Sequence, residues 1–167
     1  GADKNRLIRL DMSEYSGWGA AHRLLFGAEN RAAQWIERVR AQPFCVVLFD
    51  EIEKADPEVF DVMLGLLDEG RLTDPFGRVT DFRSAVVVLT SNLGSTARGM
   101  VGFRHGAKAE FREAVAKFFR PEFFNRLDAV VEFKPLSFHH VMDIARKEMN
   151  ELANREGLSD AGIKLTW

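Results

Sequence analysis

Residues 44–51 read FCVVLFDE, an unbroken apolar run that ends in two acidic residues. A second run of the same kind, AVVVLT at residues 85–90, is followed by Ser91 and Asn92. Strands that are apolar on both faces belong in the interior of a parallel sheet that is covered by helices. The two runs therefore predict neighbouring, nearly fully buried strands of an α/β fold.

Helical signals lie between and around these runs. Asp56 is a favoured N-cap residue, Pro57 suits the first helical position, and Gly70 can end the helix that follows. The spacing of apolar residues predicts a second helix from about Ala32 to Gln42 and a third from Ser137 to about Gly157. Buried strands that alternate with helices favour a parallel sheet.

Two further strands, a hairpin and a helix complete the expected fold. Residues 7–10 and 129–133 are rich in apolar side chains and predict strands, the second of them in the core. DPFG at residues 74–77 is a turn signal, so residues 71–82 predict a small hairpin. Apolar residues at helical spacing mark a helix over residues 111–118. We expect an α/β three-layer sandwich with a mostly parallel sheet.

The composition of the 167 residues excludes several classes of protein. Lys and Arg total 23 against 25 Asp and Glu, which leaves a formal charge of −2 and no basic excess for nucleic acid. The single cysteine, Cys45, excludes an internal disulfide or a Cys-rich metal site. No apolar run is long enough to span a membrane, and the N-terminus does not read as a signal peptide. We expect a soluble, cytoplasmic protein.

Polar side chains follow both buried runs. Asp50 and Glu51 come directly after the first, and Asn92 follows the second. Ligands of open α/β sheets bind at this carboxyl edge. In a nucleotide site Asp50 would hold the Mg²⁺ shell, Glu51 would activate the attacking water, and Asn92 would contact the γ-phosphate or position that water. Each residue taken alone also fits a plainer interpretation, in which it caps a turn or a loop.

Arg126 ends the segment RPEFFNR at residues 120–126, beside a group of aromatic residues. An arginine offered to the phosphates of a neighbouring subunit stabilises negative charge in the transition state. A lone arginine is more often one half of a salt bridge. The residues by themselves leave both interpretations open.

Together, these segments closely resemble the Clp-type AAA+ ATPases, in particular the second ATPase module of the ClpB and ClpA class. The resemblance rests first on residues 46–95, VVLFDEIEKADPEVFDVMLGLLDEGRLTDPFGRVTDFRSAVVVLTSNLGS. It continues in FRPEFFNRLDAVVEFKPLS at residues 119–137 and, upstream, in LIRLDMSEY at residues 7–15. The resemblance covers about nine-tenths of the chain, and so many motifs in the same order do not agree by accident.

The resemblance implies roles for individual residues. Asp50 and Glu51 look like the Walker B pair, Asn92 like sensor 1, and Arg126 like the arginine finger that acts on the adjacent subunit. Residues 73–79 would match the second pore loop. The implied cofactors are ATP and Mg²⁺, with Mg²⁺ at Asp50. The implied partners are a protein substrate and the other subunits of a homo-oligomeric ring, expected to be a hexamer.

The chain departs from the family pattern at its phosphate-binding loop. No G-x-x-x-x-G-K-[ST] motif occurs in it, and residues 1–4 resemble the stretch just after the Walker A helix. Residues 1–158 are therefore expected to form an AAA+ large ATPase subdomain, P-loop NTPase-like but incomplete. Residues 159–167 are expected to begin the small C-terminal lid. The omitted strand would belong between those of residues 85–90 and 129–133.

A second departure concerns the first pore loop. No Gly-Tyr-Val-Gly type motif occurs, and the chain is shorter than the family pattern near residues 27–30. Trp18 and Phe26 are nearby aromatic residues that could replace the missing side chain or could pack against the domain.

The expected function is part of an ATP-hydrolysing, chaperone- or unfoldase-like AAA+ module that remodels proteins in a ring, inactive as this chain alone. The alternative is a scaffold or regulatory module that has lost polypeptide threading, as the missing pore motif suggests. The intact Asp50, Glu51, Asn92 and Arg126 favour retained hydrolysis. A nucleic-acid motor is disfavoured by the nearly neutral charge and by the Clp-specific segments such as DEGRLTD at residues 68–74.

Overall fold

The computed structural model describes residues 6–27, 31–93, 115 and 117–153. The chain divides into two compact units, residues 1–128 and residues 129–167, which are described one at a time. The expected boundary at residue 158 and the lid beyond it lie outside the described residues. In the part that is described, no helix combines the length and the apolar character needed to cross a membrane.

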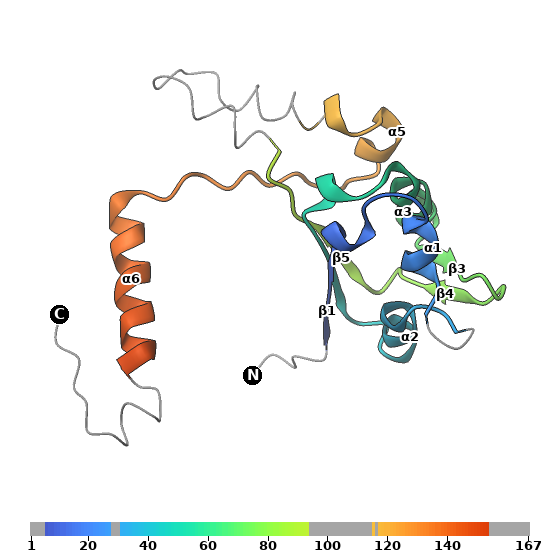
Figure 1. Cartoon of the computed structure of the whole chain (residues 1–167), viewed down its shortest axis with the longest axis horizontal. Helices are drawn as coiled ribbons and strands as arrows, with labels where there is room; N and C mark the ends of the chain where they lie inside the picture. Colours follow the sequence, from blue (N-terminus) through green and yellow to red (C-terminus); the bar gives the residue numbers. More distant parts are fainter. Residues whose placement is uncertain (1–5, 28–30, 94–114, 116, 154–167) are drawn as a thin grey trace. The chain divides into compact units, whose positions relative to one another are not determined.

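The first unit is built on a parallel sheet of three strands in the order β1-β2-β5 (Figure 1). The strands are β1 (Leu7–Asp11), β2 (Val46–Asp50) and β5 (Val86–Leu89). Both pairings are parallel and in continuous register. The α/β class, the parallel sheet and the adjacency of the two apolar runs are thus confirmed.

The two faces of this sheet differ in burial. One face carries Ile8, Leu10, Val47 and Phe49, all buried in the core. Three helices cover this face: α1 (Ala20–Leu25), α2 (Gln34–Ala41) and α3 (Pro57–Glu69) (Figure 1). Side chains of the opposite face are half-buried or exposed: Leu7, Arg9, Val46, Leu48, Val86 and Val88. The expectation of nearly full burial on both faces is therefore wrong, because the described helices of this unit lie against one face.

Helix α3 (Pro57–Glu69) has the ends that its sequence predicts. The side chain of Asp56 accepts a hydrogen bond from the backbone N–H of Glu58 at 3.1 Å, and Pro57 occupies the first turn. Gly70 ends the helix with φ of 63°, a left-handed conformation that glycine adopts at little cost. The residues that face the core share one side of the helix: Val59, Met63 and Leu66.

Of the remaining short elements of the first unit, one helix was predicted from the sequence and three elements were not. Helix α2 (Gln34–Ala41) agrees with the apolar spacing. Helix α1 (Ala20–Leu25) and two 3₁₀ turns, Met12–Tyr15 and Ile52–Lys54, were not predicted from the sequence. Elements this short carry too few residues to show a helical period.

The expected hairpin forms from β3 (Arg71–Thr73) and β4 (Val79–Asp81), which pair antiparallel. Of the helix expected over residues 111–118, residues 115, 117 and 118 are helical, and the others lie outside the described residues. A further short helix, α5 (Pro121–Phe124), follows and contacts α3.

The second unit corrects one prediction. Residues 129–137 form neither helix nor strand, and Val131 and Phe133 are 72% and 88% exposed. A strand needs a neighbour for its backbone hydrogen bonds, and no described strand pairs with residues 129–133. The core strand expected there is therefore wrong for this chain.

Helix α6 (Phe138–Ala153) follows in the same unit. Ser137 caps it as predicted: its hydroxyl accepts a hydrogen bond from the backbone N–H of His140, and its carbonyl accepts one from that of Val141.

Candidate functional site

The candidate site lies where two neighbouring strands end. Asp50 is the last residue of β2 and Glu51 follows it, while Thr90 and Asn92 come just after β5. Because β2 and β5 are parallel, their carboxyl ends meet at one edge of the sheet. We call these four residues the strand-end cluster.

Asp50 is held by two neighbours through different oxygen atoms. Its Oδ1 accepts a hydrogen bond from the Thr90 hydroxyl. Its Oδ2 accepts hydrogen bonds from the guanidinium of Arg9, with the Arg9 Nε atom at 2.9 Å. The hydrogen bond from Thr90, followed by that from Arg9, lowers the pKa of Asp50 below its ordinary value. The carboxylate therefore stays ionised at neutral pH.

Glu51 has a left-handed backbone, with φ of 56° and ψ of 51°. Such a conformation is strained in a residue other than glycine and persists where surrounding contacts enforce it. Here the backbone N–H of Glu51 donates to the Thr90 hydroxyl oxygen at 3.1 Å. Its carboxylate accepts from Lys54 Nζ at 2.5 Å and from Asn92 Nδ2 at 3.3 Å. Strained residues cluster at functional sites, which fits the role predicted for Glu51.

Asn92 is joined to the cluster by its backbone as well as its side chain. Its N–H donates to Glu53 Oε1 at 3.0 Å, while its amide reaches Glu51. The structure thus brings Asn92 to the adjacent residues Asp50 and Glu51, although Asn92 lies 41 residues after Glu51 in the sequence. All three were predicted to share one site.

Arg126 does not belong to this cluster. It lies just after α5, and its Nη1 forms an ion pair with Asp68 Oδ1 of α3 at 3.0 Å. Within this chain Arg126 is therefore a salt-bridge partner, which is the plainer of its two predicted interpretations. The role in a neighbouring subunit stays a prediction.

Three residues of the site were missed by sequence reasoning: Arg9, Lys54 and Thr90. Each contacts Asp50 or Glu51 directly. A signal was present for two of them, because Arg9 is a lone cation inside an apolar strand and Lys54 follows Glu51 by three residues, the spacing of one helical turn.

Among the described residues, no group of three or more His, Cys, Asp or Glu side chains is placed to hold a metal ion by itself. Mg²⁺ in nucleotide sites needs fewer protein ligands, because it is bound by one or two carboxylates together with phosphate oxygens and water. Asp50 supplies an ionised carboxylate and Thr90 a hydroxyl beside it, both of them hard oxygen ligands. The donor set therefore fits a Mg²⁺ that arrives with a nucleotide.

The aromatic residues near the predicted pore loops have different surroundings. Phe26 stacks on His22 with ring centroids 3.9 Å apart and meets Phe76 of the β3–β4 hairpin edge-on at 5.8 Å. Trp18 is 94% exposed, between two glycines with positive φ. Phe26 therefore packs against the domain, whereas Trp18 is free to touch another molecule.

A buried carboxylate fixes the hairpin to α2. The side chain of Asp74 is fully buried and accepts from Arg40 at 3.1 Å and from Arg78 Nε at 2.9 Å. Burial alone would raise its pKa, but hydrogen bonds from the backbone N–H groups of Arg78 and Phe76 and from the two arginines outweigh it and lower the pKa. The segment predicted as the second pore loop is thus held in a defined position.

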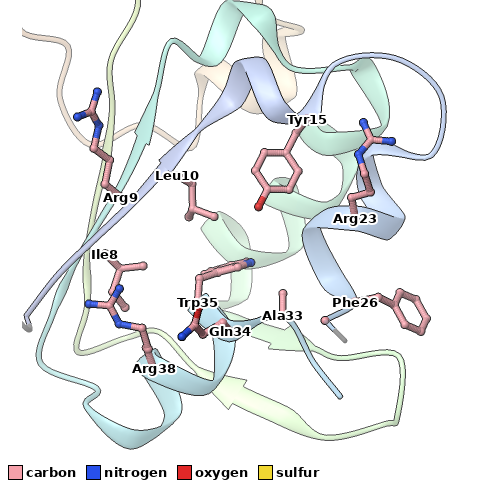
Figure 2. Close-up of a pocket in the computed structure, with 11 residues that line it drawn as sticks. Ile8, Arg9, Leu10, Tyr15, Arg23, Phe26, Ala33, Gln34, Trp35 and Arg38 are labelled. Carbon is pink, nitrogen blue, oxygen red and sulfur yellow. The ribbon is translucent and has the colours of Figure 1, made fainter. Parts of the chain in front are cut away.

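A separate pocket of about 280 Å³ lies between β1 and helices α1 and α2. Figure 2 shows Tyr15 and Trp35 toward its middle and Arg23 and Arg38 on opposite sides. Both of these guanidinium groups donate to backbone carbonyl oxygens, so they support the local fold. Arg9 lines this pocket and also contacts the strand-end cluster.

Comparison with known proteins gives consistent results. A family model described as AAA domain (Cdc48 subfamily) matches residues 1–130. The chaperone protein ClpB of Corynebacterium diphtheriae is 46% identical over 92% of this chain and 18% of the relative. That of Tropheryma whipplei is 44% identical over 96% of this chain and 24% of the relative.

A solved structure of S. cerevisiae Hsp104 with casein, in an extended conformation, is similar with a TM-score of 0.79 and 33% identity. The match covers 92% of this chain and 28% of the Hsp104 chain. The chain thus spans roughly a fifth to a quarter of the length of these relatives, between 18% and 28%.

Proposed function

Because the chain belongs to the AAA domain family (Cdc48 subfamily), we propose that it forms the catalytic part of an ATP-hydrolysing module that remodels proteins in a homo-oligomeric ring. The observation that carries this proposal is the contact between Asn92 and Glu51 beside Asp50, at the edge of a parallel sheet. A polar residue that orients a carboxylate next to a potential Mg²⁺ ligand is the arrangement that water-mediated phosphoryl transfer needs.

In this proposal Asp50 and Thr90 face the Mg²⁺ that accompanies the nucleotide, and Arg9 keeps the carboxylate of Asp50 oriented. The ion neutralises charge on the phosphates when it is bound. Glu51 accepts a proton from the attacking water. Its strained, left-handed backbone sets the direction in which its side chain leaves the main chain. Asn92 donates a hydrogen bond to one oxygen of Glu51, and in this proposal it also contacts the attacking water.

The remodelling function and its partners are extended to this chain from its similarity to ClpB and Hsp104. Hsp104 has been solved with casein, which supports a protein as the substrate. We propose a ring of identical subunits, six in number, in which Arg126 of one subunit approaches the phosphates bound to the next.

A scaffold without polypeptide threading is the second candidate. It is favoured by the missing Gly-Tyr-Val-Gly type motif and by Phe26, whose ring packs on His22 and Phe76 rather than standing free. A scaffold of this kind needs neither an oriented Glu51 nor an ionised Asp50, so measurable ATP turnover that depends on both residues would exclude it.

We expect this chain alone to bind ATP too weakly for detection at micromolar nucleotide. The backbone N–H nest and the lysine of a phosphate-binding loop supply most of the contacts to phosphates, and the sequence contains no such motif. Isothermal titration calorimetry with Mg²⁺ and ATP checks this. Micromolar affinity would show that the nucleotide binds somewhere other than the strand-end cluster.

The decisive test of the proposed function is Arg126→Ala in the complete protein that contains this chain. Loss of an arginine that acts across subunits lowers turnover by about 10³–10⁵-fold. Steady-state phosphate release should therefore fall close to background, while the assembly state measured by light scattering stays unchanged. Arg120→Ala is the matched control, because Arg120 also pairs with an aspartate of α3 and is expected to keep turnover. Normal turnover in Arg126→Ala would show that Arg126 does not act on the nucleotide of a neighbouring subunit.

A further inference from the structure

Two arginines beside α5 are paired with two aspartates on α3. Arg126 Nη1 lies 3.0 Å from Asp68 Oδ1, and Arg120 Nη1 lies 2.9 Å from Asp61 Oδ1. Asp61 and Asp68 are seven residues apart, which places them on the same side of the helix two turns apart. The Arg126 and Asp68 side chains are each 49% exposed, so solvent reaches this pair.

The backbone position of α5 is set by apolar packing rather than by these ion pairs. Phe123 is 1% exposed, and its ring centroid lies 5.2 Å from each of the rings of Phe60 and Phe119. Arg126 is tied to this anchor, because its backbone N–H donates to the carbonyl of Phe123 at 3.1 Å. The aromatic cluster thus fixes the backbone of Arg126, and the ion pair with Asp68 sets the direction of its guanidinium.

We propose that Asp68 is a positioning residue that holds the guanidinium of Arg126 until the phosphates of a neighbouring subunit replace it. This inference rests on the proposed function. Exposed ion pairs are weak and are screened by salt. A bound nucleotide presents several negative charges to the same guanidinium and can form bidentate contacts with it. The exchange of Asp68 for phosphate therefore needs little energy.

The exchange has a measurable consequence for nucleotide affinity. While Asp68 holds Arg126, the fraction of subunits ready to contact a neighbour's phosphate is reduced, and apparent affinity falls by that fraction. Removing the carboxylate should raise the affinity without changing the chemical step. Asp68 holds Arg126 only before Arg126 reaches the nucleotide, so its removal favours the ground-state complex and the transition state equally over the free protein. Such a change lowers KM and leaves kcat unchanged.

The test is Asp68→Asn in the complete protein, with Asp61→Asn as the matched control. We expect Asp68→Asn to lower KM for ATP about two- to fivefold, the range that an exposed ion pair supports. Its kcat should stay within about twofold of the unmutated protein, and Asp61→Asn should change neither constant. The difference in KM should shrink at high salt, because salt already weakens the pair that the substitution removes.

Several outcomes would overturn the inference. An unchanged KM, a lowered kcat, or equal changes in Asp68→Asn and Asp61→Asn would each show that Asp68 does not compete with nucleotide. Melting temperatures are recorded for both variants, and Asp68→Gln replaces Asp68→Asn if the latter does not fold. Arg126→Ala separates the two proposals. If it keeps turnover, the role of Arg126 in a neighbouring subunit fails, and this inference fails with it. If it loses turnover while KM in Asp68→Asn is unchanged, the positioning role of Asp68 alone fails.

Discussion

Glu51→Gln in the complete protein is expected to lower ATP turnover by about 10²–10⁴-fold, the contribution typical of a general base. Glutamine has nearly the same shape, and its side-chain oxygen can still accept the hydrogen bond that Asn92 Nδ2 donates to Glu51 at 3.3 Å. It cannot take a proton from water at neutral pH. Steady-state phosphate release measures the loss, and titration with a fluorescent nucleotide should show that binding is kept.

Glu58→Gln is the control for this substitution. Glu58 lies in the first turn of α3, is exposed, and belongs to no part of the strand-end cluster. The substitution Glu58→Gln changes the net charge by the same amount as Glu51→Gln and should leave turnover within about twofold of the unmutated protein. If Glu51→Gln retained turnover, or if it lost nucleotide binding together with turnover, Glu51 would not be the base.

The sequence predicted the elements whose signals are local. The capping residue Asp56, Pro57 and Gly70 all lie within or beside α3, so its ends could be read directly. The apolar runs that became β2 and β5 were long enough to indicate strands, and their parallel pairing followed from the helix between them. Short elements such as α1 carried no comparable signal.

The strand expected at residues 129–133 shows why pattern alone was not sufficient. Its composition is that of a core strand, but a strand forms only when another strand bonds to its backbone. The described sheet ends at β5, and no described strand pairs with residues 129–133. The apolar pattern shows that the segment could form a core strand, whereas strand formation also requires a neighbouring strand to pair with.

The candidate site was predictable in its acids and not in their contacts. That Asp50, Glu51 and Asn92 meet follows from the rule that parallel strands end at one edge. The lone cation Arg9 and the spacing of Lys54 from Glu51 marked these residues as candidates, but that Arg9 bonds to Asp50 and Lys54 to Glu51 depends also on side-chain directions, which the sequence does not give. The same holds for Arg126 and Asp68, which lie 58 residues apart in the sequence (126 − 68).

The aromatic cluster that anchors α5 leads to the largest expected effect on stability. Phe123→Ala should lower the free energy of unfolding of this chain by about 3–5 kcal/mol, the usual cost of removing a fully buried phenylalanine. The ring is 1% exposed and packs against those of Phe60 and Phe119, so its removal leaves a cavity in the aromatic cluster. Urea unfolding followed by circular dichroism measures the change.

Phe118→Ala is the matched control, because Phe118 belongs to the same cluster but is 42% exposed. The ring of Phe118 buries less apolar area than that of Phe123, so its removal should cost no more than about 1–2 kcal/mol of the free energy of unfolding. If the two variants were equally destabilised, packing of α5 on α3 would not depend on the buried ring. With Phe123 removed, the segment that carries Arg126 loses its anchor, and the ion pair with Asp68 is too exposed to hold it in place.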